Sequence, residues 1–167
     1  MAFDAYIKID GIPGDSTDKK HEKWIEVQAF NHSISQIGGG SSSAQGTHTG
    51  GKADHSEFQI TKALDSASPV LAAYCCDGKP IPNITLELCR AMGDKVCFMK
   101  YVFKDSIISS VQVGGGAGGS DMPVESISIR YGQILWEYTP TDPKTGGKTG
   151  ASIKQGWDTF TNEKVGG

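Results

Sequence analysis

The chain has 167 residues, with 16 Lys and Arg, 19 Asp and Glu, and a formal net charge of −3. This length suits one domain, which we expect to span residues 1–167. The mild acidity argues against nonspecific nucleic-acid binding, which needs a basic face. The chain contains no apolar stretch of membrane-spanning length, and its start lacks the pattern of a secretory signal. We therefore expect neither membrane insertion nor an ordinary export signal.

The first third of the chain predicts two strands and a glycine-rich loop. Apolar residues alternate with polar ones over residues 3–9, which is typical of a strand with one buried face. A second, longer strand is predicted from Trp24 to Ser35, with a bulge near Ala29-Phe30 where the apolar phase shifts. The segment from Gln36 to Asp54 is predicted to be a long loop, because it holds almost no side chain that could pack a core. A loop of this length in a compact domain is usually functional or disordered.

A short strand near 57–60 and one short helix are predicted next. Ser68 is a suitable N-cap, Pro69 suits the first helical position, and Gly78 suits the C-terminal stop. The helix is too short to be stable alone and must pack on a sheet. Its apolar face consists of Val70, Leu71, Tyr74 and Cys75.

The second half of the chain predicts further strands between glycine-rich turns. Alternating residues indicate strands over 84–89, 97–103, 107–113 and 124–138, while the tail from Thr139 is predicted to be irregular. Both faces of the 97–103 strand carry apolar residues, more than a half-exposed sheet requires. These elements favour a mainly β fold, either a barrel or a sandwich, with the helix on one side.

Motifs that often carry chemistry are present only in incomplete form. Gly114, Gly116 and Gly119 match a dinucleotide-binding pattern, but a strand rather than a helix is predicted to follow them. Gly147-Lys148-Thr149 resembles the end of a P-loop, but Asp142 stands where the first glycine should be. No acid–base pair or nucleophile motif can be assigned. We therefore expect no catalytic site and no cofactor.

Neither the four histidines nor the four cysteines have the spacing of metal ligands. No metal site is expected, and the histidines are interpreted as solvent-exposed loop residues: His21, His32, His48 and His55. Disulfides are rare in a reducing compartment, so the cysteines are interpreted as small apolar core residues: Cys75, Cys76, Cys89 and Cys97. The alternative is a redox role for the adjacent pair Cys75-Cys76.

A domain with no visible active site, apolar residues on both strand faces and a long loop suggests an assembly subunit. Short motifs with a particular order and spacing extend this interpretation over nearly the whole chain. They are Asp4-x-Tyr6-Ile7-Lys8-Ile9-Asp10-Gly11-Ile12, Gly14-Asp15-Ser16, His21, Trp24-Ile25-x-Val27, Thr61-Lys62-x-x-Asp65, Ser68-Pro69-x-Leu71, Tyr101, Asp105, Glu125-Ser126-Ile127-Ser128-Ile129-Arg130-Tyr131-Gly132, Trp136-x-Tyr138 and Gly156-Trp157-Asp158. Together they resemble the haemolysin-coregulated protein (Hcp) family, the tube subunit of the bacterial type VI secretion system. The family more often has Gly-Glu-Ser where this chain has Gly14-Asp15-Ser16.

The resemblance implies a mainly β fold: a partly open β-barrel of two packed sheets, with one short flanking helix and a long extended loop. It implies a structural, non-enzymatic role in which six subunits form a ring whose lumen is lined by sheet. The rings stack into a tube inside a contractile sheath, and the tube, a spike protein and effector proteins leave the cell together. Such a protein is made in the bacterial cytoplasm and exported through the type VI machine itself without a signal peptide.

The same resemblance implies that the loop from Gln36 to Asp54 reaches an adjacent subunit or ring. Its candidate contact residues are Gly38, Gly39, Gly40, Ser41, Gln45, Thr47, His48 and Gly50. The candidates for residues facing the lumen are Asn31, His32 and Ser33. Three alternatives remain open: a phage-like tail tube protein, a monomeric ligand-binding β-barrel, and a secreted effector with its own enzymatic activity.

Overall fold

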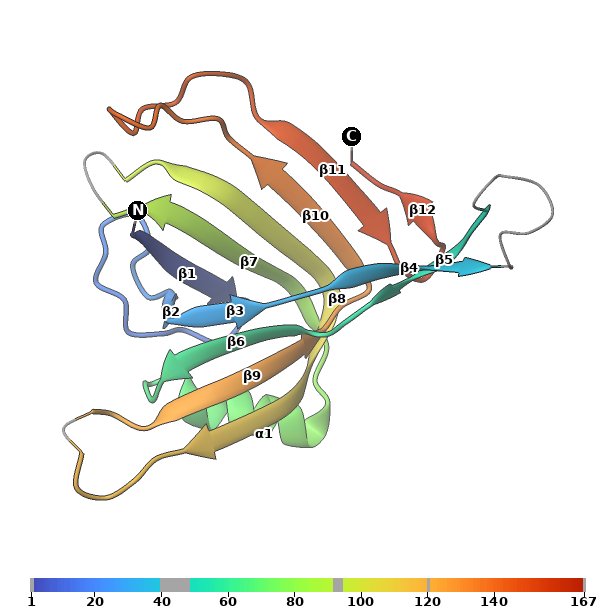
Figure 1. The fold of residues 1–167 in the computed structure, drawn as a ribbon. Coiled ribbons are helices and arrows are strands. Elements are labelled where there is room, and N and C mark those ends of the chain that lie inside the picture. The colour runs from blue at the N-terminus through green and yellow to red at the C-terminus, as the bar shows by residue number, and fades with distance from the viewer. Residues whose placement is uncertain (1, 40–48, 92–94, 120, 167) are drawn as a thin grey trace.

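A computed structural model describes residues 2–39, 49–91, 95–119 and 121–166 of the chain. Within these ranges the chain forms one helix and a set of antiparallel strands (Figure 1). The helix is α1 (Ser68–Asp77). The strands are β1 (Phe3–Ile9), β2 (Ile25–Val27), β3 (Ala29–Asn31), β4 (Ile34–Gly39), β5 (Thr49–His55), β6 (Phe58–Ala63), β7 (Ile81–Arg90), β8 (Cys97–Gly114), β9 (Val124–Arg130), β10 (Gln133–Tyr138), β11 (Ile153–Asp158) and β12 (Glu163–Lys164).

Two curved sheets share the long strand β8. Its first half pairs with β7 and β10, while its second half, from Ile107 onward, pairs with β9. Between the halves, Asp105 takes a positive φ of 53°. The Gly132 N–H donates to the carbonyls of Lys104 at 3.0 Å and Asp105 at 3.1 Å, which holds this point of the strand. The two strands expected over 97–103 and 107–113 are therefore one continuous strand that passes from one sheet into the other.

The first sheet has the order β12-β11-β10-β8-β7-β1-β2, and the second continues from β8 through β9 and β6 to β3. The chain also changes sheets at Gln28, whose N–H donates to the Thr61 carbonyl at 2.8 Å. The strand predicted over 24–35 is thus divided at this corner into β2 and β3. Among the described residues, β12, β2 and β3 each pair on one side only, so the barrel stays partly open, as predicted.

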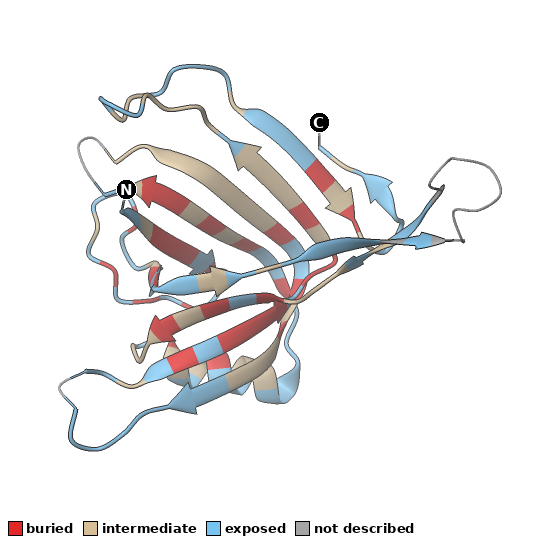
Figure 2. Ribbon diagram, viewed as in Figure 1, coloured by how far each residue is buried: buried red, intermediate tan, exposed pale blue. Residues whose placement is uncertain are grey.

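Buried side chains from the two sheets form one hydrophobic cluster, and Figure 2 shows the buried residues of both sheets in red. Phe58 and Phe103 are fully buried, and their ring centroids are 4.8 Å apart. Each such side chain contributes about 1.5–3 kcal/mol when it leaves water. Branched aliphatic residues from both sheets surround the two rings: Ile7, Ile25, Ile60, Ile84, Leu86, Ile127 and Ile129.

Helix α1 flanks the barrel and confirms the predicted position of the one short helix. Leu71 is buried, and the other apolar residues of the predicted face pack partly buried against the core. Gly78 ends the helix in the left-handed region with φ of 62°. The predicted N-cap is wrong, because Ala67 is the cap residue and the Ser68 hydroxyl instead donates to Glu125 at 2.7 Å. Within the described ranges, no helix has the length and apolar character needed to cross a membrane.

The C-terminal tail is more regular than predicted. Strand β11 pairs with β10, and β12 pairs with β11. A Cβ at Gly156 would collide with the Val165 carbonyl oxygen, so this glycine allows two backbone segments to approach closely. Counting glycines suggested an irregular tail, but this glycine supports strand pairing.

Two of the four cysteines form a disulfide, Cys89–Cys97. The two residues are register partners across the hairpin of β7 and β8, which brings together positions separated by 8 in the sequence. The interpretation of all four cysteines as unpaired core residues is therefore wrong for this pair. Cys75 and Cys76 on α1 are free thiols, the first half-buried and the second exposed.

Candidate assembly surface

Strands β4 and β5 form a separate two-stranded sheet, which we call the hairpin arm (Figure 1). It extends away from the barrel and pairs with no other strand among the described residues. Its register runs from Ile34 opposite His55 to Gly39 opposite Thr49, with an irregularity between Gln36 and Gly38. The loop predicted over 36–54 is thus, in its described part, a hairpin. Backbone hydrogen bonds form its ladder and require no side chains, so the missing apolar pattern did not reveal the strands.

Three side chains fasten the base of the hairpin arm to the barrel. The Tyr131 hydroxyl lies 2.7 Å from His32 Nε2 and 2.9 Å from His55 Nδ1. Burial raises the pKa of Tyr131, so the phenol stays protonated, and burial lowers the pKa of both His32 and His55. A neutral phenol can donate to one imidazole while accepting an N–H from the other. The base is therefore fully hydrogen-bonded when both histidines are neutral.

Backbone contacts complete this attachment. The Ser33 N–H donates to the Ser56 hydroxyl at 2.9 Å, and the Ser56 N–H donates to the Ser33 carbonyl at 3.0 Å. Beside them, Arg130 and Glu57 form an ion pair of 2.7 Å at the edge of a hollow that the exposed ring of Phe160 also lines. The hairpin arm therefore leaves the barrel from a point fixed by hydrogen bonds on both of its strands.

The predicted contact residues fall into two groups. Three lie on the described part of the hairpin arm, namely Gly38, Gly39 and Gly50. The others lie outside the described residues: Gly40, Ser41, Gln45, Thr47 and His48. The three lumen candidates lie at the end of β3 and just before the hairpin arm, where Asn31 and Ser33 are exposed and His32 is half-buried. The described members of both sets therefore lie on or beside the hairpin arm.

The histidines are not all exposed loop residues, contrary to the prediction. His21 is 1% exposed and stacks on Tyr6, with ring centroids 4.3 Å apart. His32 and His55 are half-buried at the base of the hairpin arm, and His48 lies outside the described residues. The spacing in the sequence gave no sign of these positions, because His21, His32 and His55 contact residues that are distant along the chain.

Exposed apolar residues lie on both sheets. Tyr138 and Ile153 are register partners and so share a face, which we call the β10–β11 patch. Val113 and Val124 are exposed at the end of the β8–β9 pair, but they occupy successive positions of the ladder and point to opposite faces. Exposed apolar groups that cluster in this way are typical of contact surfaces.

Comparisons with known proteins agree with this architecture. The family model described as "Type VI secretion system effector, Hcp" matches residues 6–138. Protein hcp1 of Pseudomonas aeruginosa is 33% identical over 163 residues, covering 97% of this chain and 98% of the relative. The Major exported protein of the same organism is 28% identical, covering 83% of this chain and 90% of the relative. A solved structure of a type six secretion system protein is similar with a TM-score of 0.92 and 41% identity, covering 98% of this chain and all of the other.

An open, two-sheet β-barrel with a flanking helix is the architecture that these matches share with the chain. The chain therefore belongs to the Hcp family of type VI secretion proteins.

Proposed function

We propose that this chain is a ring-forming subunit of the type VI secretion tube that also carries effector proteins during export. The observation that carries the proposal is the hairpin arm. Its two strands leave the barrel and pair only with each other in the described residues. Their outer edges therefore present backbone donors and acceptors that a strand of a second copy can complete.

The exposed apolar residues support a ring of identical subunits. A closed ring needs two different and complementary surfaces on each subunit, so that each copy contacts the next in the same way. The β10–β11 patch is our candidate for one surface, and the hairpin arm, which leaves the barrel elsewhere, is our candidate for the other. We propose a hexamer, as the family resemblance implies, with rings that stack inside a contractile sheath beneath a spike protein.

The proposal extends to cargo and export. Asn31, His32 and Ser33 are the proposed lumen-facing segment, where exposed polar side chains would meet an effector. The chain would be made in the bacterial cytoplasm and would leave the cell through the type VI apparatus, without a signal peptide and without an enzymatic step of its own.

The competing function of a monomeric ligand-binding barrel is disfavoured by the core. Such a barrel holds its ligand between the sheets, where this chain places the fully buried rings of Phe58 and Phe103. A phage-like tail tube protein would share the ring and the hairpin arm, and it differs in its partners.

The decisive experiment removes the tip of the hairpin arm and measures assembly. Deleting residues 39–51 keeps three register pairs at the base, from Ile34–His55 to Gln36–Ala53. Light scattering and negative-stain images of the same peak should show six-chain rings for the wild type and smaller species for the deletion. Far-UV circular dichroism should show that the barrel remains folded.

A point variant tests the ring interface separately. Ile153→Asp places a charge in the β10–β11 patch at an exposed position, so it should break the ring without unfolding the chain. The matched control is Ala72→Asp, an exposed position of α1 outside the β10–β11 patch and the hairpin arm. Rings and secretion unchanged by the deletion would contradict the role of the hairpin arm. A wild type that stays monomeric at every concentration would favour the ligand-binding barrel.

A further inference from the structure

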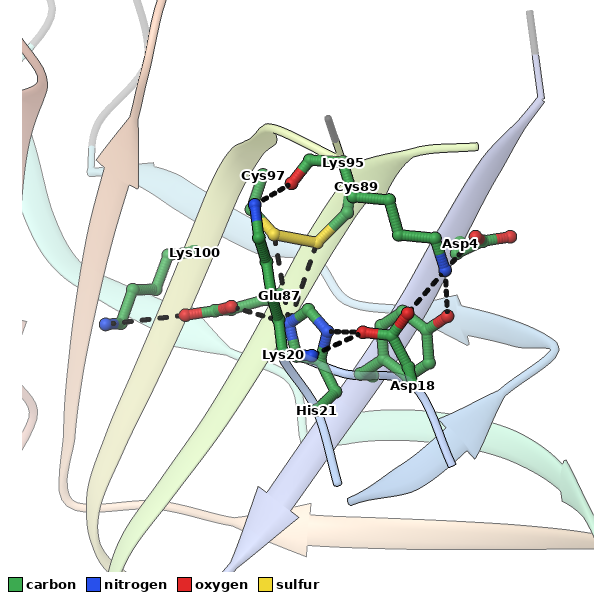
Figure 3. The surroundings of a disulfide bond; sticks show 10 residues. Asp4, Asp18, Lys20, His21, Glu87, Cys89, Lys95, Cys97 and Lys100 are labelled. Carbon is green, nitrogen blue, oxygen red and sulfur yellow. Dashed lines mark hydrogen bonds and ion pairs between the residues drawn. A yellow bond between two sulfur atoms is a disulfide. The ribbon is translucent and has the colours of Figure 1, made fainter. Parts of the chain in front are cut away.

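A cluster of metal-ligand residue types, two of them buried and two half-buried, lies beside the hairpin of β7 and β8 (Figure 3). Glu87 and Cys89 are two positions apart on β7 and so share a face. Cys97 faces Cys89 from β8, and His21 comes from the segment between β1 and β2. One donor atom from each residue lies within 4.8 Å of the others. Ligand spacing in the sequence predicted no metal site, because these residues come from three separate segments.

The distances around His21 suit a tetrahedral ion. Its Nε2 atom lies 2.9 Å from Glu87 Oε2 and 3.8 Å from the sulfur atom of each cysteine. A tetrahedral Zn²⁺ separates its nitrogen, oxygen and sulfur ligands by about 3.3–3.8 Å. Two pairs lie closer than this, the bonded sulfur atoms and the His21–Glu87 pair at 2.9 Å. Reducing the disulfide allows the sulfur atoms to move apart, and the Glu87 oxygen must move outward by about 0.4 Å to admit the ion. Two thiolates, one imidazole and one carboxylate are ligands that Zn²⁺ accepts.

The imidazole of His21 is oriented by a carboxylate, as the imidazole of a metal-binding histidine commonly is. Its Nδ1 lies 2.8 Å from Asp18 Oδ1, while Asp18 Oδ2 lies 2.7 Å from Lys95 Nζ. A carboxylate behind a histidine fixes the tautomer and the ring orientation in metal sites. The Nδ1–H donates to Asp18, and the Nε2 lone pair points into the cluster.

His21 Nε2 and Glu87 Oε2 lie 2.9 Å apart, and Nε2 also lies close to both sulfur atoms. In the reduced form two sulfur ligands join the same space, and one divalent cation can satisfy all four donors at once. Lys100 lies 3.5 Å from the other Glu87 oxygen, Oε1, so Oε2 remains directed at the cluster.

We propose that His21, Glu87, Cys89 and Cys97 form a Zn²⁺-type site in the reduced protein, which oxidation converts into the Cys89–Cys97 disulfide. A small-molecule disulfide is the oxidant. The half-buried Cys97 thiolate attacks it, forms a mixed disulfide and releases one thiolate. The Cys89 thiolate then attacks the Cys97 sulfur and releases the second thiolate. Two electrons pass from the cysteine pair to the oxidant, and the ion, having lost both sulfur ligands, leaves as the hydrated cation.

Metal content in the two redox states tests this directly. The full chain is reduced until four thiols titrate, incubated with Zn²⁺ alone, desalted and analysed by elemental mass spectrometry. We expect one Zn²⁺ per chain in the reduced protein and none in the disulfide form. Adding oxidised glutathione to the loaded protein should release one Zn²⁺ for each disulfide formed, as read with a chromogenic chelator. Co²⁺ in place of Zn²⁺ should give thiolate charge-transfer bands and the intense visible bands of tetrahedral coordination.

Matched variants locate the site. Cys89→Ser with Cys97→Ser should abolish uptake, whereas Cys75→Ser with Cys76→Ser removes the same number of thiols from α1 and should leave it intact. Glu87→Gln should weaken binding at least tenfold, and Asp18→Asn should weaken it by about 10- to 100-fold through the imidazole. Circular dichroism checks the fold of each variant. The proposal is overturned if the reduced wild type binds no more Zn²⁺ than the Cys89→Ser/Cys97→Ser protein, or if bound Co²⁺ shows only octahedral oxygen ligation.

Discussion

Replacing Lys62 by Met should cost several kcal/mol of stability, because it leaves a buried carboxylate without its cation. The Lys62 side chain is 0% exposed, and its Nζ lies 2.7 Å from both Glu125 Oε2 and Asp65 Oδ1. Glu125 is 2% exposed, and after the substitution it keeps the hydrogen bond that the Ser68 hydroxyl donates to it. Breaking a buried ion pair by removing one partner costs about 3–5 kcal/mol.

An independent upper limit on the stability lost in Lys62→Met has a similar magnitude. A buried carboxylate that loses its cation can take up a proton instead. For a glutamate with an ordinary pKa of about 4.3, this costs about 3.7 kcal/mol at pH 7. With a urea slope of roughly 2 kcal/mol per M, the unfolding midpoint of Lys62→Met should fall by about 2 M. The assay is urea unfolding followed by circular dichroism at one fixed protein concentration, because assembly contributes to apparent stability.

A double-mutant cycle shows whether the effect belongs to the pair. Adding Glu125→Leu removes the stranded carboxylate, so the double variant should be at least about 2 kcal/mol more stable than the sum of the single changes predicts. Lys154→Met is the control, because Lys154 is exposed and lies 3.7 Å from Glu137, and it should change stability by less than about 1 kcal/mol. The reasoning fails if Lys62→Met also costs less than about 1 kcal/mol, or if the two changes are additive.

Three further predictions concern pH and close packing. Asp18→Asn should destabilise the chain at pH 7, because the hydrogen bond from Lys95 lowers the pKa of Asp18 in the folded state. This stability is lost as pH falls, so the difference in unfolding free energy between the variant and the wild type should shrink below about pH 4. Burial lowers the pKa of His32 and His55 from 6.5, so the unfolded chain binds protons first and stability should fall as pH drops below that value. His55→Asn should reduce this slope in thermal melts measured between about pH 7 and 5; an unchanged slope would contradict the assignment. Gly14→Ala should cost about 1–3 kcal/mol in urea unfolding, because its Cβ would collide with backbone atoms of the strand that begins at Ile25, and a neutral effect would disprove that contact.

The predicted elements that proved correct depend on short-range signals. Alternation over residues 3–9 predicted β1, and the Pro69 and Gly78 signals predicted the extent of α1. The errors arise where backbone pairing acts without a side-chain pattern. The hairpin arm is glycine-rich and β11 has no clear apolar alternation, so their ladders become visible only when partner strands are in place.

The candidate assembly surface was likewise predictable from the sequence only in part. The glycine-rich segment could be singled out from composition, because nothing in it could pack a core, but its attachment through Tyr131 could not. The Tyr131 hydroxyl meets His32 across 99 positions of sequence, a contact that depends on how β9 and β3 lie in the second sheet.

The sequence by itself determined a mainly β chain with one short helix and, through the order of its motifs, membership of the Hcp family. These follow from signals that act over a few residues or from motifs read in order. Only the tertiary structure decided which buried polar groups meet. Lys62 and Glu125 are 63 positions apart, and His21 and Glu87 are 66 apart. Their contacts depend on strand register and on β8 passing between the sheets, and a one-residue change of register would turn these side chains to the opposite face.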